Sequence, residues 1–348
     1  MNSKSIICLE PWDGAGISKM DTGLGNRIIH WSILYYISCI FKNCKIVVEK
    51  KYWPELDFLE LPNTDIQDID YDDLKNNSKR LLSQDIQEII YNKNLDSFDS
   101  FCSYYSDTYI LLPNEILIKG IKKIKFKDKN INNFFQNNFS NFYSLHLRRG
   151  LGTIPSTGYI KDFLFYKDKS ELKEYLNEYY FSGGYWYWGN TFPKLYTIVS
   201  DSVYFKIVDE VISINKEQKF YISSDIHENY YSYYFDKYPY NFVKIEDRFE
   251  EFLNLCNYDE SMRDESITYP LKQTLRNLFD LFVLSHSQGL IMDSSSTWGT
   301  VSSLIFRQKQ VINLIEYILR KDSISYKEFV EKYSYKKILV SPWSKFMM

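Results

Sequence analysis

Apolar and polar positions in the first fifty residues follow two different periods. Residues 6–9 form a short apolar run, and residues 11–25 follow as a loop rich in glycine. From Asn26 onward, apolar residues recur every three or four positions, which predicts a helix: Ile29, Ile33, Tyr36, Ile37 and Ile40. Residues 46–48 form the next apolar run. The pattern predicts a strand–loop–helix–strand unit, which is typical of α/β folds.

A second series of the same kind begins near Phe142. We expect strands at residues 142–147, 219–222, 290–292 and 311–312, and helices at residues 205–214, 269–284 and 297–306. Repeated strand–helix units predict parallel sheets covered by helices on both faces. Two such series predict an α/β chain with two Rossmann-like domains that face a central cleft, with ligands at the carboxyl ends of the strands.

The residues between the two series carry a weaker pattern. Residues 63–140 are polar and rich in Asn, Asp and Lys, so we expect helices and long connections there. A chain of 348 residues is long enough for two domains of ordinary size. We place the boundary near residue 140, which divides the chain into residues 1–140 and 141–348.

The net charge bears on whether the chain binds nucleic acid or anionic membranes. The formal net charge is −3, which gives no electrostatic reason to expect binding to nucleic acid or to an anionic membrane. Aromatic residues make up 18% of the chain, whereas alanine occurs only at Ala15. Either surfaces that stack on sugar rings or a codon bias toward Asn, Lys, Ile, Tyr and Phe explains this excess. Runs such as residues 130–135 favour the codon bias.

The five cysteines are scattered and include no CxxC pair, which indicates small buried residues in a reducing compartment: Cys8, Cys39, Cys44, Cys102 and Cys256. The apolar run at residues 6–9 is too short for a signal-peptide core. The longest stretches without charge, residues 28–41 and 179–193, fall short of the roughly 20 residues of a membrane span. We therefore expect a cytoplasmic location and no transmembrane segment.

Four motifs lie where a predicted strand meets a loop or helix. The first, residues 22–27 (TGLGNR), lets backbone N–H groups approach an anion or a sugar at a helix start. Its candidate donor-binding residues are Gly23, Gly25, Asn26 and Arg27. A plain tight turn capped by Asn26 explains the motif equally well.

In the second motif, residues 145–150 (LHLRRG), a strand ends in two arginines. Alternation places His146 and Arg148 on one side of the strand and Arg149 on the other. The guanidinium fork of arginine suits a pyrophosphate, whose charge grows as it leaves. Pairing of both arginines with surface carboxylates is the structural alternative.

The third and fourth motifs place small polar residues directly after strands. Residues 220–225 (FYISSD) offer Ser223 and Asp225 to a ribose hydroxyl or a base N–H, although a helix cap at Ser224 or Asp225 explains the motif as well. Residues 292–300 (MDSSSTWGT) place hydroxyl groups at a helix start, where they form an anion-binding nest: Ser294, Ser295, Ser296 and Thr297. Capping alone needs one hydroxyl, so four in succession favour anion binding.

Taken in order, GLGNR, HLRRG, FYISSD and DSSST resemble the fucosyltransferase superfamily, which includes α1,6- and α1,2-fucosyltransferases and protein O-fucosyltransferases. The resemblance implies a GT-B fold and a GDP-β-L-fucose donor bound mainly by the C-terminal domain. It also implies inverting transfer that needs no metal or other cofactor. The N-terminal domain would then lie on the acceptor side.

The resemblance also implies roles for individual residues. Arg148 resembles the arginine that holds the donor β-phosphate, and His146 and Asp225 resemble guanosine contacts. Residues 294–297 resemble phosphate-binding hydroxyls. Asn26, with the loop of Gly23 and Gly25, resembles the lip that faces fucose and acceptor. Leu151 stands where some family members carry an aspartate.

The residues themselves agree with metal-free transfer. Stabilising a departing pyrophosphate requires a metal or fixed cationic groups, and Arg148 and Arg149 provide the latter. Asp68 and Asp70 form a DxD-like pair, but a solvated loop explains them better. A general base would deprotonate the acceptor hydroxyl, and the candidates are Asp13 and Asp21. A path with little base assistance is the alternative.

The densest aromatic cluster lies at residues 179–190 and includes Tyr185, Trp186 and Trp188. It lines the acceptor cleft or forms a lid with glycine hinges; the alternative is a hairpin packed in the core. We expect an enzyme of glycan biosynthesis that moves L-fucose from GDP-fucose to a glycan hydroxyl. The alternatives are a transferase of the same fold that uses another nucleotide-sugar, and a binding module without turnover.

Overall fold

The computed structural model describes residues 5–9, 24–41, 44–68, 76, 78–92, 101–104, 114–147, 165–166, 198–199, 201–224, 231–259, 261, 271–292, 297–305, 310–314 and 328. The chain divides into two compact units. Unit 1 comprises Met1–Asn133 with Glu251–Phe279, and unit 2 comprises Phe134–Glu250 with Asp280–Met348. The roles predicted for residues 1–140 and 141–348 stay predictions.

Unit 1 is built on a parallel sheet with strand order β4-β2-β1-β6-β5. Its strands are β1 (Ser5–Leu9), β2 (Cys44–Val48), β4 (Thr64–Ile66), β5 (Lys79–Leu81) and β6 (Phe101–Tyr104). Its helices are α1 (Leu24–Ile40), α3 (Ser83–Asn92) and α4 (Asn114–Ile121), with two short 3₁₀ turns, η1 (Lys50–Tyr52) and η2 (Pro54–Asp57). A two-stranded antiparallel pair, β3 (Leu59–Glu60) and β7 (Lys125–Phe126), completes it.

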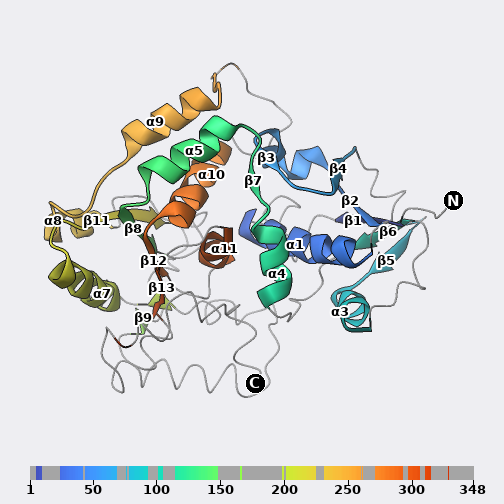
Figure 1. Cartoon of the computed structure of the whole chain (residues 1–348), viewed down its shortest axis with the longest axis horizontal. Helices are drawn as coiled ribbons and strands as arrows, with labels where there is room; N and C mark the ends of the chain where they lie inside the picture. Colours follow the sequence, from blue (N-terminus) through green and yellow to red (C-terminus); the bar gives the residue numbers. More distant parts are fainter. Residues whose placement is uncertain are drawn as a thin grey trace, which may run out of the picture. The chain divides into compact units, whose positions relative to one another are not determined.

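Unit 2 is built on a second parallel sheet with strand order β11-β8-β12-β13 (Figure 1). Its strands are β8 (Phe142–Leu147), β11 (Lys219–Ser224), β12 (Gly289–Met292) and β13 (Gln310–Asn313), with a separate parallel pair, β9 (Phe165–Tyr166) and β10 (Ile198–Val199). Its helices are α7 (Asp201–Ile214), α8 (Tyr233–Lys237) and α11 (Thr297–Ile305). The unit boundaries fall within α5 (Lys129–Asn138), α9 (Glu246–Leu255) and α10 (Leu271–His286).

The predicted α/β class with two Rossmann-like halves is confirmed, and so are the strands and helices of both predicted series. In unit 2, one face of the sheet packs into an apolar cluster with α7, since alternation along the strands puts these side chains together: Tyr143, Leu145, Leu147, Phe220, Ile222 and Ile291. The helix expected from Asn26 begins two residues earlier, at Leu24. Asn26 therefore lies within the first turn and does not cap it.

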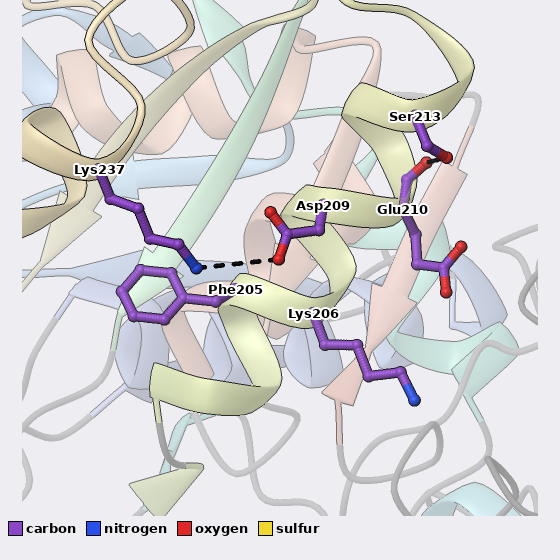
Figure 2. A pocket seen from close by; sticks show the side chains of 6 residues that line it. All are labelled: Phe205, Lys206, Asp209, Glu210, Ser213 and Lys237. Atoms are coloured by element: carbon purple, nitrogen blue, oxygen red, sulfur yellow. Dashed lines mark hydrogen bonds and ion pairs between the residues drawn. The ribbon is translucent and has the colours of Figure 1, made fainter.

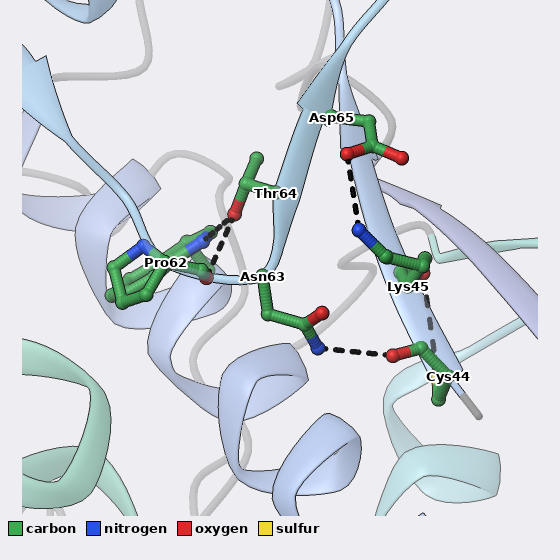
Figure 3. A network of polar contacts seen from close by, with 7 residues as sticks. Cys44, Lys45, Pro62, Asn63, Thr64 and Asp65 are labelled. Atoms are coloured by element: carbon green, nitrogen blue, oxygen red, sulfur yellow. Dashed lines mark hydrogen bonds and ion pairs between the residues drawn. The ribbon is translucent and has the colours of Figure 1, made fainter. Parts of the chain in front are cut away.

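The expectation of helices and long connections at residues 63–140 is wrong in part, because β4, β5, β6 and β7 also lie there. β4 and β5 are edge strands whose side chains are mostly exposed, so no apolar run marks them. Side-chain bonds hold β4 in place (Figure 3). The Trp31 indole donates to Thr64 Oγ1 at 2.8 Å, and the Asn63 amide donates to the Cys44 carbonyl at 3.0 Å.

The cysteines were expected to be buried, which is correct for three of them and wrong for Cys39. Cys8, Cys44 and Cys102 are buried, and burial raises the pKa of the Cys44 thiol to about 12. Cys39 is exposed, because it lies on the side of α1 that turns away from the core. Within the described ranges, no helix is long and apolar enough to cross a bilayer.

Candidate nucleotide-sugar site

The carboxyl ends of β8, β11 and β12 lie at one edge of the unit 2 sheet and carry the described residues of three predicted motifs. β8 lies between β11 and β12, and all three strands are parallel. His146 is the register partner of both Ser223 on β11 and Met292 on β12. Ser223 and Ser224, expected directly after a strand, instead lie within β11, which runs two residues further than predicted. The sheet order makes the ends of the three strands neighbours.

On β8 and β11, the sheet face that carries His146 is polar, in contrast to the apolar face described above. Ser144 and His146 on β8 alternate with the apolar set, and Tyr221 and Ser223 are their partners on β11. All four are buried, with His146 3% and Ser223 4% exposed. Burying a polar side chain costs free energy unless it is hydrogen-bonded. The hydrogen-bond partners of these four residues therefore indicate how this face is stabilised.

Two contacts fix the end of β8 at His146. The Tyr204 hydroxyl of α7 donates to the His146 carbonyl at 2.8 Å. Gly299 in the first turn of α11 lies against the imidazole, and a Cβ there would be 3.2 Å from His146 Cδ2 and 3.3 Å from Met292 Sδ. Glycine thus lets the start of α11 come close to the ends of β8 and β12.

Side-chain hydrogen bonds join the end of β11 to β8 and to α10. The Ser224 hydroxyl donates to the Leu147 carbonyl at 2.8 Å, so Ser224 joins two strands and does not cap a helix. On α10, the Asp280 carboxylate accepts from the Tyr221 hydroxyl at 2.6 Å and from Ser223 Oγ at 3.4 Å. These bonds hold the polar face rigid, which suits the floor of a binding site.

In unit 1, the predicted GLGNR motif opens α1. Gly25 is buried in its first turn, and Asn26 and Arg27 are half-buried. The Arg27 guanidinium forms a two-pronged ion pair with Glu55, with Nη1 2.8 Å from Oε2 and Nη2 2.6 Å from Oε1. The contacts that the structure gives Arg27 are therefore to protein groups, and its donor-binding role stays a prediction.

Many of the predicted site residues lie outside the described residues: Asp13, Asp21, Gly23, Arg148, Arg149, Tyr185, Trp186, Trp188, Asp225, Ser294, Ser295 and Ser296. Thr297 begins α11, as predicted. The roles of all these residues stay predictions. Sequence reasoning missed Glu55, Tyr204, Asp280 and Gly299, and only the glycine, which follows the hydroxyl cluster of the fourth motif, offered a local signal.

A shallow pocket of about 460 Å³ lies elsewhere on unit 2, between α7 and α8 (Figure 2). The Lys237 ammonium lies 3.9 Å from the centre of the Phe205 ring and 3.8 Å from Asp209 Oδ2. Lys206, Glu210 and Ser213 complete its lining. These lining residues include none that the four motifs predicted.

Comparison with known proteins gave matches among solved structures only. No protein-family model matches the chain, and no curated protein matches its sequence. The solved structures that the chain matches include fucosyltransferases. NodZ α-1,6-fucosyltransferase soaked with GDP-fucose is 10% identical, with a TM-score of 0.48 over 89% of this chain and 94% of that chain.

POFUT1 in complex with GDP is 9% identical, with a TM-score of 0.46 over 90% of this chain and 98% of that chain. FUT1 of Arabidopsis thaliana in complex with GDP is 8% identical, with a TM-score of 0.43 over 88% of this chain and 69% of that chain. The function proposed below rests on the residues and geometry of this chain.

Proposed function

We propose that this chain is an inverting glycosyltransferase that moves L-fucose from GDP-fucose to a glycan hydroxyl without a metal ion. The observation that supports it most is that His146, Ser223 and Met292, the described strand-end residues of three motifs, are register partners at the adjacent carboxyl ends of β8, β11 and β12. In open parallel sheets, ligands bind at this edge. In the sequence, two arginines follow β8 and a run of hydroxyl residues precedes α11, and both groups suit a nucleoside diphosphate in particular.

Each predicted residue then has a chemical task. Arg148 and Arg149 neutralise the pyrophosphate as the bond to the sugar breaks, and residues 294–297 bind it with hydroxyl and N–H groups at the start of α11. His146 and Asp225 contact guanosine beside Ser223. Asp13 or Asp21 accepts the proton of the acceptor hydroxyl, and Asn26 faces the sugars. The acceptor site is lined by Tyr185, Trp186 and Trp188.

Nucleotide preference tests the donor. Isothermal titration of the chain with GDP and with UDP should show tighter binding of GDP. A preference for UDP would contradict the fucose assignment and favour another nucleotide-sugar. GDP release from GDP-fucose in the presence of a panel of glycan acceptors separates an enzyme from a binding module, because the module binds GDP without releasing it from the donor.

Arg148→Ala tests the leaving-group role. Removing a group that stabilises transition-state charge lowers kcat by about 10²–10³-fold. Lys216→Ala, at an exposed position of unit 2, should leave kcat unchanged. Near-normal turnover in a folded Arg148→Ala protein would refute the role of Arg148. Activity that is lost in EDTA and returns with Mn²⁺ would refute the metal-free mechanism.

A further inference from the structure

Arg27 is held from two sides by the segment that follows β2. Besides the two-pronged pair with Glu55, its Nη1 donates to the carbonyl of Tyr52. Its guanidinium lies over the Trp53 ring, 5.0 Å from the ring centre. The side chains of Arg27 and Glu55 are 17% and 4% exposed. A planar guanidinium makes the paired bonds and the stacking at once, which the point charge of lysine does not.

The partner segment is itself anchored in unit 1. Trp53 and Leu56 are each 3% exposed, so η2 is fixed by apolar side chains on both sides of Glu55. Pro54 opens η2 with a restricted φ angle, which adds stiffness. Glu55 is thus a fixed point, and the arginine reaches it from the first turn of α1.

These contacts make Arg27 a poor phosphate ligand. The Glu55 carboxylate already neutralises the guanidinium, and a diphosphate bound there would lie beside a buried negative charge. Like charges at short range in a partly buried site repel strongly. The geometry favours a role in which Arg27 holds the turn and a neighbouring residue contacts the ligand.

That neighbour is Asn26. Its Oδ1 atom is shielded from solvent and has no hydrogen-bond partner within the part of the chain that the structure describes. A buried acceptor without a donor is unfavourable, and a ligand hydroxyl supplies one. Since Asn26 and Arg27 share the first turn of α1, fixing Arg27 fixes the direction of the carboxamide.

We propose that Arg27 and Glu55 are a pair of positioning residues that orient Asn26 toward a sugar hydroxyl of the donor or acceptor. This inference rests on the proposed function. It assigns to Arg27 a task other than the binding of donor phosphate. It also gives a role to Glu55, 28 residues away in the sequence.

Kinetics of the single and double variants separate positioning from phosphate binding. In Arg27→Lys and Glu55→Gln, kcat for fucose transfer should each fall about tenfold or more, with Kd for GDP changed less than twofold. The double variant should be no slower than the slower single variant, because both lose the same interaction. If Arg27 binds phosphate, Arg27→Lys alone raises Kd for GDP, and that result would overturn the proposal.

The same segment offers a matched control. Lys50 and Asp57 form an ion pair at 3.0 Å whose side chains are 54% and 46% exposed. Asp57→Asn removes a carboxylate near Glu55 without releasing α1, so kcat should stay at the wild-type value. An equal loss in Asp57→Asn would show that any change in this segment slows the enzyme, which contradicts a specific role for Glu55.

Amide hydrogen exchange tests the pair even if fucose transfer is never seen. In the second turn of α1, the N–H groups of Ile28, Ile29 and His30 donate to the carbonyls of the first turn, four residues earlier. Their exchange should speed up at least tenfold in Glu55→Gln and stay unchanged in Asp57→Asn. Unchanged exchange in Glu55→Gln overturns the positioning proposal. An inactive wild-type protein with the expected exchange instead refutes the proposed function alone.

Discussion

Gly289 at the start of β12 leaves room for an aromatic ring. A Cβ atom there would lie 2.3 Å from Cε1 of Tyr143, its register partner on β8. Tyr143 is buried in the apolar cluster of unit 2, so its ring cannot turn away without displacing its neighbours. We expect Gly289→Ala to lower the free energy of unfolding by about 1–3 kcal/mol, measured by urea denaturation.

A double-mutant cycle shows whether the ring is the cause. Tyr143→Leu removes the atoms that would clash, and in that background Gly289→Ala should cost clearly less than in the wild type. An equal cost in both backgrounds would place the effect in the backbone of β12 and contradict the packing explanation.

At the residue scale, the sequence predicted residues near the strand ends and missed the residues that hold the candidate site residues in place by hydrogen bonds. His146 and Ser223 could be placed because alternation and the end of an apolar run mark them locally. Glu55 and Asp280 could not, because each acts on a residue at least 28 positions away. Such pairs are set by how strands and helices pack, and no local pattern records them.

At the scale of elements, α1 and α4 pack closely where α4 carries a glycine. A Cβ on Gly120 would lie 2.8 Å from the Ser32 Cα, a backbone atom that cannot rotate away. Alanine gains helix propensity of about 1 kcal/mol, but forcing the helices apart costs about 1–3 kcal/mol. We therefore expect Gly120→Ala to destabilise unit 1 in thermal and urea unfolding.

The control for this prediction is Lys122→Ala. Lys122 is exposed just after α4, and its replacement should change the free energy of unfolding by less than about 0.5 kcal/mol. If Gly120→Ala stabilises the protein instead, the gain in helix propensity exceeds the cost of moving α4 away from α1. That result would contradict the packing explanation.

Strand length explains which elements the sequence could predict. β8 and β11 each have six residues with a long buried run, and their strands were predicted. β4 and β5 have three residues each, and their places come from hydrogen bonds to β2 and β6. Short edge strands depend on their neighbours more than on their own side chains.

At the scale of the whole molecule, each unit carries a histidine that burial keeps neutral. Burial lowers the pKa of His30 on α1 from 6.5 to about 4. His286 on α10 stacks on the ring of Phe135, and burial lowers its pKa to about 4 as well. In the unfolded chain both recover a pKa near 6.5, so the unfolded state binds more protons between pH 4 and 6.5.

Stability should therefore fall as the pH is lowered through this window. Each histidine contributes a slope of about 1 kcal/mol per pH unit and up to about 3 kcal/mol in total. Urea denaturation at pH 7, 6 and 5 measures the slope above the range where most carboxylates titrate. His30→Gln and His286→Gln should each flatten it, since glutamine takes up no proton. A wild-type protein equally stable at pH 7 and 5, or variants with the wild-type slope, would show that burial of these histidines does not set the acid sensitivity of the fold.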